Sequence, residues 1–256
     1  MNVTFHQFIL FFIIFVRVTT VLVTVPFFGF EAVPLHVKAG LSALLGILIF
    51  PFVDNTGVKI PTEFVPFVIM TMNEVIIGMV IGFAANILFV GVRFAGELIG
   101  LDMGFGIANI IDPLSGEEVS IIGELKYLLA LLLFLCINGH HFLIQALKLS
   151  FDVIPVTKTL YSAIAVKKLI SMSGEIFTVA IKLGSTTLGA LFITNFIMAI
   201  LARTVPQMNI FIVGFPVKIS VGFIMILVSL PFFVYVFNKF YYVYERDIIE
   251  LMKIIK

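Results

Sequence analysis

Long apolar stretches separated by short polar segments dominate the pattern along the chain. They run over residues 8–28, 39–53, 64–92, 121–137, 176–201 and 219–237. Because a helix of roughly 20 residues crosses the bilayer core, the pattern predicts an all-α integral membrane protein with about six spans. The second stretch is short and the third is long. Such uneven lengths favour helices that are tilted, re-entrant or shielded by other proteins over a regular bundle.

Two regions interrupt this rhythm, and the C-terminal end has a pattern of its own. Residues 93–124 are rich in glycine and acids, and residues 150–175 are polar, which predicts a solvated connection with a helical turn or two. In the tail, residues 241–256, apolar side chains recur at helical spacing. We expect a short amphipathic helix there, lying either at a membrane interface or on a partner.

Composition narrows the class of protein further. Hydrophobic residues make up 61% of the chain and charged residues 12%, against roughly 25% charged residues in soluble domains. The formal net charge is +1 without a basic block, so the sequence excludes a soluble enzyme, a disordered chain and a nucleic-acid binder. The distribution of Lys and Arg between the stretches places both termini in the cytoplasm if every stretch crosses the membrane.

Three glycines recur every four residues in the middle of the chain. Gly96, Gly100 and Gly104 form one smooth ridge if they lie on a helix. Ridges of small residues allow the backbones of two membrane helices to approach closely. The spacing therefore predicts a helix-packing ridge, although it does not say against what.

Three charged residues lie inside apolar stretches, namely Arg17, Glu74 and Lys182. A charge at mid-bilayer costs roughly 2.5–3.5 kcal/mol or more, so such residues usually face protein or water. Either they form an ion or proton path, or they are polar contacts between subunits. Their scatter and mixed sign favour buried charges within an assembly.

Other candidate chemistry is sparse. The adjacent His140 and His141 point to different faces of a helix and do not have metal-ligand spacing. Cys136 is the one cysteine, so neither a disulfide within the chain nor a cysteine-based metal site is expected. Serine-hydrolase and ATP-binding motifs are missing. We expect no enzymatic activity, no metal and no cofactor.

The most informative segment follows the glycine ridge. Pro113 and Gly116 prevent a continuous helix, and polar residues between them invite turns. Irregular backbone at membrane depth occurs only where protein or a water-filled cavity surrounds it. The segment is therefore either an ordinary external loop or a plug that closes a pore; the candidate plug residues are Phe105, Ile107, Asn109, Ile110, Ile111, Asp112 and Pro113.

Short motifs in a fixed order give the chain a resemblance to one family. They are Arg17 with Pro26-Phe27-Phe28-Gly29; Pro34 with Val37-Lys38; Gly96-Glu97-Leu98-Ile99-Gly100 with Met103-Gly104; Asp112-Pro113 with Ser115-Gly116; Asn138-Gly139-His140-His141 with Ser150-Phe151 and Pro155; Arg203 with Pro206-Gln207-Met208-Asn209; and Gly214-Phe215-Pro216-Val217-Lys218. In these motifs the chain resembles the FliR/SctT family, the R-type subunits of the flagellar and injectisome type III export gate. One position departs from the family pattern, because Asp102 stands where the family commonly has Gln. A carboxylate there needs a partner or water.

The resemblance implies a structural gate subunit in the bacterial inner membrane and the flagellar basal body. Helical hairpins would pack in a hetero-oligomeric helical assembly with P-type and Q-type subunits (FliP and FliQ), next to FlhB- and FlhA-type export proteins and membrane lipid. Residues 1–256 would form one membrane domain: a P-like part over about 1–200, with the plug at 105–120, and a Q-like hairpin with the amphipathic tail over about 201–256. Unfolded flagellar proteins would pass through the gate.

Two alternatives stay open at the level of sequence. The first is the homologous gate subunit of an injectisome. The second is a secondary transporter for a small solute, which would use Glu74, Lys182 and broken helices as its binding site.

Overall fold

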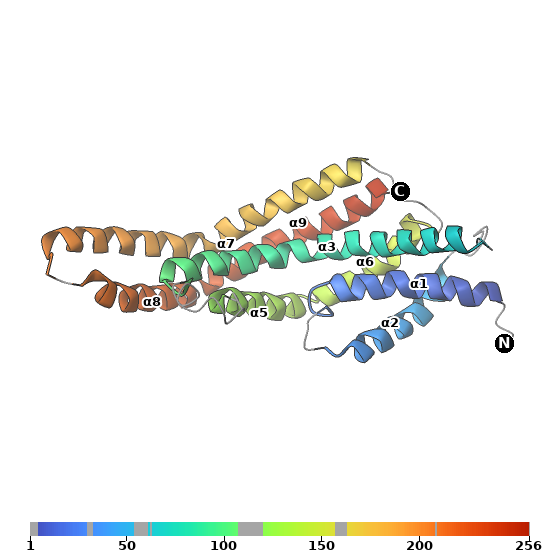
Figure 1. The fold of residues 1–256 in the computed structure, drawn as a ribbon, viewed down its shortest axis with the longest axis horizontal. Coiled ribbons are helices and arrows are strands. Elements are labelled where there is room, and N and C mark those ends of the chain that lie inside the picture. The colour runs from blue at the N-terminus through green and yellow to red at the C-terminus, as the bar shows by residue number, and fades with distance from the viewer. Residues whose placement is uncertain are drawn as a thin grey trace. The chain divides into compact units, whose positions relative to one another are not determined.

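Helices make up all the regular structure that is described. The computed structural model describes residues 5–29, 33–53, 61, 63–106, 120–156, 163–207 and 209–255, and within these ranges the expected all-α fold is confirmed (Figure 1). In chain order the elements are α1 (Phe5–Thr24), α2 (Leu35–Ile49), the 3-10 helix η1 (Phe50–Phe52), α3 (Phe64–Met103), α5 (Ile121–Cys136), α6 (Gly139–Val153), α7 (Ala163–Thr204), α8 (Ile210–Val228) and α9 (Leu230–Ile255).

The lengths of these helices identify a multi-pass membrane protein. Four helical segments of the described chain are long and apolar enough to cross a bilayer: His6–Thr24, Leu35–Phe52, Phe64–Met103 and Ala163–Thr204. Two bent pairs bring the number to as many as six, with a bend of 74° between α5 and α6 and of 59° between α8 and α9. The left-handed backbone of Asn138, with φ of 59°, lies at the first of these bends. The fourth and sixth apolar stretches of the sequence therefore each belong to a broken pair rather than to one straight helix.

Two polar regions are more helical than their composition indicates. α7 begins at Ala163, so most of the expected solvated connection at 150–175 is the start of a 42-residue helix. Ala165 and Met172 lie buried on one face of that start, whereas Lys167 is exposed on the other. Likewise α3 continues past Arg93 as far as Met103. In both places one buried face is enough to stabilise a helix whose other face is polar.

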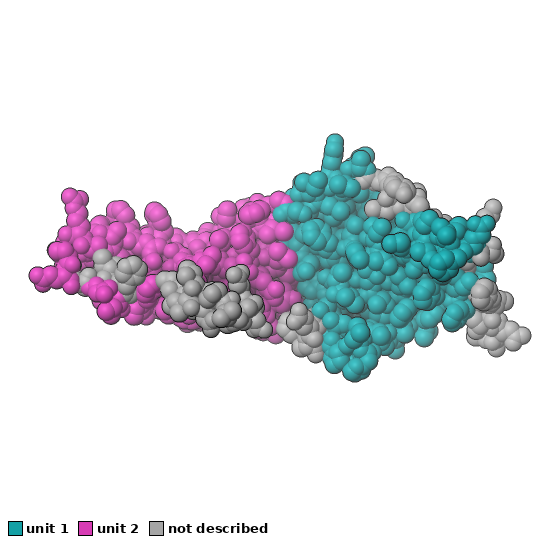
Figure 2. All heavy atoms as spheres, in the orientation of Figure 1, with its two compact units in different colours: residues 1–87, 134–173, 243–256 teal, residues 88–133, 174–242 magenta. Residues whose placement is uncertain are grey.

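Two compact units divide the chain (Figure 2). Unit 1 comprises residues 1–87, 134–173 and 243–256. Its core contains Ile13 and Val18 of α1 and Ile77 of α3, all fully buried. A Cβ placed on Gly78 of α3 would lie 2.7 Å from the Cβ of Thr20, so only glycine lets α1 approach here.

The C-terminal tail belongs to unit 1 from Val243 onward and is not a separate element. It is the end of the 26-residue helix α9, and it buries its apolar face, made of Ile248, Leu251, Met252 and Ile255. On α7, Lys168 Nζ lies 2.9 Å from Asp247 Oδ1 and 2.8 Å from Glu250 Oε2. The tail is amphipathic as expected, but it packs on its own chain. A location on a membrane surface or on a partner was the wrong expectation.

Unit 2 comprises residues 88–133 and 174–242. Its core brings together residues of four helices: Ile99 and Met103 of α3, Ile122 of α5, Leu191 of α7 and Ile226 of α8. Phe105, just after α3, packs against this cluster. The division near residue 200 into a P-like and a Q-like part describes a likeness to other gate subunits. It stays a prediction.

Candidate functional site

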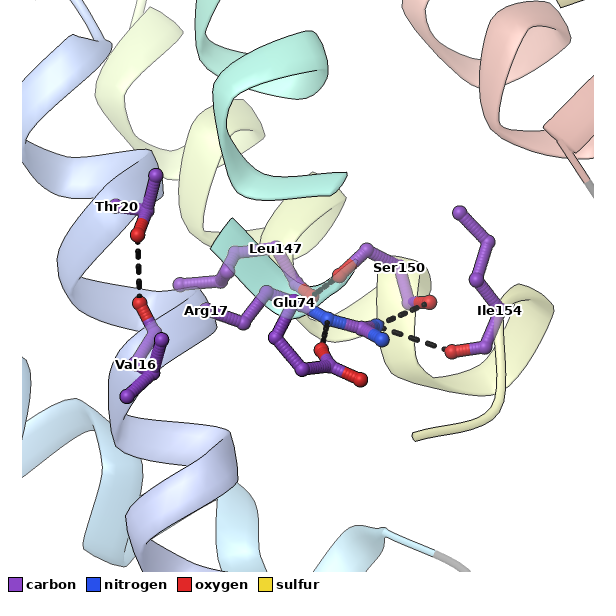
Figure 3. Close-up of polar contacts among 7 residues, drawn as sticks. All are labelled: Val16, Arg17, Thr20, Glu74, Leu147, Ser150 and Ile154. Carbon is purple, nitrogen blue, oxygen red and sulfur yellow. Dashed lines mark hydrogen bonds and ion pairs between the residues drawn. The ribbon is translucent and has the colours of Figure 1, made fainter. Parts of the chain in front are cut away.

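A buried ion pair links two helices of unit 1 (Figure 3). Arg17 extends from α1 and Glu74 from α3, and both side chains have no exposed surface. Arg17 Nε donates a hydrogen bond to Glu74 Oε2 over 2.5 Å. Each charge is thus neutralised inside the chain, which is the usual condition for keeping ionised groups away from water.

The same guanidinium holds the end of a third helix. Arg17 Nη1 donates to the backbone oxygens of Ser150, at 3.1 Å, and Ile154, at 3.0 Å, in and just after the last turn of α6. The Ser150 oxygen also accepts from the Ile154 amide, at 2.9 Å. The last carbonyls of a helix carry partial negative charge, so a cation is favourable there. Arg17 also lies over the ring of Phe151, 4.4 Å from its centroid. One side chain therefore ties α1 to α3 and to α6.

Two polar atoms of this cluster have no hydrogen-bond partner among the described residues. They are Arg17 Nη2 and Glu74 Oε1, and both are buried. The pair is joined through a single hydrogen bond rather than the two-bond fork that Arg and a carboxylate can form. The geometry makes the cluster a clamp between helices of one chain. A further role of these charges in an assembly with other subunits stays a prediction.

Lys182 lies apart from this cluster. It belongs to the part of α7 in unit 2, and its side chain is exposed on the chain. Lys182 Nζ lies 5.3 Å from the centroid of the Phe240 ring on α9. The structure pairs Arg17 with Glu74 within unit 1, whereas Lys182 belongs to unit 2.

Two of the three ridge glycines face α5, whereas Gly104 faces α8, where a Cβ would lie 2.5 Å from Phe215 Cδ1. A Cβ on Gly96 would lie 2.5 Å from the Cα of Gly123, close to the start of α5. A Cβ on Gly100 would lie 2.9 Å from Ser120 Oγ. Ser120 in turn accepts a hydrogen bond from the Gly123 amide and caps α5. The glycines permit close packing of α3 on α5, because a side chain at Gly96 would overlap the α5 backbone and one at Gly100 would press on the capping Ser120.

Gly104 has a different role from the other two. Its φ is +98°, and it ends α3. The Gly104 amide donates to Leu101 O, at 3.1 Å, and the Phe105 amide donates to Gly100 O, at 3.0 Å. This pair of bonds is the Schellman motif, whose left-handed residue is usually glycine. The four-residue period alone could not separate a packing glycine from a capping one.

The acid that departs from the family pattern has a partner. Asn195 Nδ2 on α7 donates to Asp102 Oδ1 over 2.7 Å. Asp102 directly precedes Met103, which belongs to the unit 2 core. The Schellman motif, the contact of Phe105 with the core and this hydrogen bond together fix the backbone that leads into the candidate plug segment.

Most candidate plug residues lie outside the described residues. These are Ile107, Asn109, Ile110, Ile111, Asp112 and Pro113. Phe105 is described, and its ring meets Phe223 of α8 edge-on with centroids 6.4 Å apart. The structure thus describes the residue from which the candidate plug starts.

Sequence patterns alone do not reveal two parts of this arrangement. The carbonyls of Ser150 and Ile154 complete the Arg17 site, and the signal for them was a helix end just before Pro155. The amide of Asn195 lies 93 residues from Asp102 and carries no local signal. The rings of His140 and His141 lie 4.3 Å apart between centroids and are tilted by 47° to each other. The described residues contain no group of three or more side chains that could hold a metal ion.

Comparison with known proteins assigns the chain to a family. The family described as bacterial export proteins, family 1, matches residues 8–242. The flagellar biosynthetic protein FliR of Bacillus subtilis (strain 168) is 32% identical over 249 residues, which cover 94% of this chain and 93% of that protein. The proteins of the same name from Escherichia coli (strain K12) and Aquifex aeolicus (strain VF5) are each 31% identical over 84% of this chain, and cover 82% and 83% of their own lengths. The chain therefore belongs to the bacterial export proteins of family 1.

Proposed function

We propose that this chain is a structural subunit of the flagellar type III export gate. The observation that carries the proposal is the match to proteins named for flagellar biosynthesis over most of the length of both partners. The chain would lie in the bacterial inner membrane at the flagellar basal body. It would guide unfolded flagellar proteins across the membrane without catalysing a reaction.

The partners in this proposal are the P-type and Q-type gate subunits, FliP and FliQ, with FlhB- and FlhA-type export proteins beside them. Apolar side chains exposed along α7 support an assembly, since Phe192, Phe196 and Ile200 are half exposed or more. Large exposed apolar surfaces mark contacts with lipid or with other subunits. These side chains belong to one long helix, which suits packing against further helices.

Co-purification with its neighbours tests the proposal. The tagged chain, expressed with the P- and Q-type subunits of the same genome and extracted in mild detergent, should elute as one complex of defined mass. Deleting its gene in the same bacterium should remove flagella and stop filament-protein secretion. A chain that purifies alone, in a bacterium whose gene deletion leaves flagella intact but abolishes uptake of a solute, would contradict the gate and favour a transporter.

The loop that follows α3 is the proposed plug of this gate. Its support is the fixed base of the segment: the Gly104 cap, the Phe105 contact with the core and the Asp102–Asn195 hydrogen bond. An unfolded chain has to displace the plug while the residues that hold the plug to the protein stay in place. The contacts just before residue 107 would hold it in this way. Asn195→Leu should weaken the anchor by breaking the bond to Asp102.

A deletion separates a plug from an ordinary connection. Removing residues 107–111 should leave the complex assembled and raise its ion conductance in planar bilayers, because the apolar residues that exclude water are gone. Gly189 on α7 is exposed, and a Cβ added there would meet no atom within 4 Å, so Gly189→Ala serves as a control that should leave conductance unchanged. If the assembled deletion variant has the same conductance as the wild type, the segment is an ordinary connection and not a plug.

A further inference from the structure

A pocket of about 320 Å³ opens between α7 and α8 in unit 2. Its wall is mostly apolar and includes Met198, Ala199, Ala202 and Phe215. Its polar lining residues are Asn195 and Lys218. The volume is at the lower end of the roughly 300–1,000 Å³ of pockets that bind small molecules. It suits a short apolar segment beside one charged group.

The two polar residues differ in whether their hydrogen-bond donors are already used. Asn195 already donates its Nδ2 to Asp102. Lys218 is half-buried and forms no ion pair or hydrogen bond with any residue that the structure describes. A lysine ammonium that lines an apolar pocket within a membrane helix normally faces an anion or water. Lys218 therefore has donors available for an incoming anion.

The stretch of chain around Lys218 contains no acid. Residues 176–244 contain no Asp or Glu, whereas they contain Lys182, Arg203, Lys218 and Lys239. Among the described acids of unit 2, Asp102 is bound to Asn195 and Glu124 to Arg93 at 3.0 Å, and neither Glu97 nor Glu175 lines the pocket. Because the pocket lining contains no acidic residue, an occupant with a negative charge of its own would complement Lys218.

We propose that this pocket binds an anionic phospholipid, with part of one acyl chain between α7 and α8 and the phosphate against Lys218. An anionic lipid brings both parts that the pocket calls for: an apolar chain for the wall that includes Met198 and Phe215, and a negative charge for Lys218. Basic pockets between membrane helices are known sites for anionic headgroups. The inference rests on the multi-pass membrane fold and is independent of the flagellar role.

The absence of tryptophan gives a direct measurement. The chain contains no Trp, so Phe215→Trp places a single fluorophore in the pocket wall. The full chain, alone and in the assembled gate, is reconstituted in lipid nanodiscs of phosphatidylcholine. A fixed mole fraction of the lipid is then replaced by brominated phosphatidylglycerol or by brominated phosphatidylcholine. The brominated anionic lipid should quench the fluorophore with an apparent affinity about fivefold higher, as one lysine beside an anionic headgroup predicts.

Three further substitutions in this reporter chain locate the effect. Lys218→Gln should abolish the preference for the anionic lipid. Lys239→Gln is the matched control, because Lys239 lies in the same acid-free stretch but does not line the pocket. Ala199→Phe fills the pocket without changing the charge and should reduce quenching by both lipids. Unaltered elution of the gate complex checks the folding of each variant.

Several results would overturn the inference. Equal quenching by the two brominated lipids in the reporter chain would remove the anionic selectivity. Selectivity that survives Lys218→Gln would place the headgroup elsewhere. If a carbodiimide couples Lys218 to a carboxylate of another subunit in the assembled gate, and the preference for anionic lipid is lost there, the occupant is a protein side chain.

Discussion

Replacing Arg17 tests how much of unit 1 depends on a single buried charge. Arg17→Leu removes the partner of Glu74, the two hydrogen bonds to the end of α6 and the contact with the Phe151 ring. Glu74 is then left buried and unpaired at 0% exposure. Arg17→Gln removes the charge but keeps an amide that can donate to one of these oxygens.

The expected magnitudes follow from the burial of the pair. Breaking a buried ion pair by removing one partner costs about 3–5 kcal/mol. Replacing both partners by apolar residues is often neutral or stabilising relative to the pair, so Arg17→Leu/Glu74→Leu should recover at least about 2 kcal/mol over Arg17→Leu alone. Part of the loss should persist in the double variant, because the Ile154 carbonyl loses its donor and the Ser150 carbonyl keeps only the Ile154 amide, at 2.9 Å. Arg17→Gln should fall between the wild type and Arg17→Leu.

Thermal stability of the detergent-solubilised chain provides the measurement. Aliquots are heated, and the fraction that still elutes as a monodisperse peak is recorded for the wild type, the single variants and the double variant. Thr20→Val is the matched control, since Thr20 lies one turn along α1 and its hydroxyl donates only to Val16 O of the same helix, at 2.9 Å. The control should melt with the wild type.

One pattern of results would refute this reasoning. If Arg17→Leu melts with the wild type, the guanidinium is not needed to compensate Glu74. If the double variant is as unstable as the sum of the two single variants, the residues are energetically independent, contrary to their direct contact.

Further predictions concern the glycines and the tail. Gly104→Ala should destabilise the chain by at least about 1–2 kcal/mol in the same assay, because a Cβ disfavours the left-handed backbone at φ +98° and would also lie 2.5 Å from Phe215 Cδ1. An unchanged melting temperature would argue against both the Schellman cap and the close contact with α8. Gly96→Leu should prevent accumulation of the folded chain even when it is expressed alone, because the side chain meets the α5 backbone; loss of the complex with a normally folded chain would instead place the ridge at a subunit interface. Lys168→Met should lower stability by no more than about 1 kcal/mol for each partly exposed ion pair. Truncation after Arg246 should lower stability far more, because it removes the buried Leu251 and Met252. Equal losses of stability would show that the ion pairs hold the tail in place.

From the sequence, unusual residues could be singled out. The residues that they contact could not be predicted. Arg17 and Glu74 could be singled out because each charge interrupts an apolar run, but their pairing could not be predicted, since 57 residues separate them. Similarly, the glycine period identified a close helix contact, while the contacting helix and the separate role of Gly104 depended on where the chain turns. Helical periodicity specifies a face of a helix. The neighbour of that face is decided by long-range packing.

The C-terminal tail shows the same limit of local sequence patterns. Its apolar face was evident from the spacing of Ile248, Met252 and Ile255, and the amphipathic pattern alone fitted both a membrane surface and a protein partner. What decided the outcome was an apolar surface on other parts of unit 1, together with Lys168 opposite Asp247. Neither is visible in the local sequence.

The link between Arg17 and Glu74 also has a consequence for the order of events during synthesis. Ribosomes add about 5–20 residues per second, so the 57 residues that separate the two charges take roughly 3–11 s to make. Throughout that interval Arg17 exists without its acidic partner. The ion pair can form only after α3 has been made, and until then the guanidinium needs water or other polar groups around it.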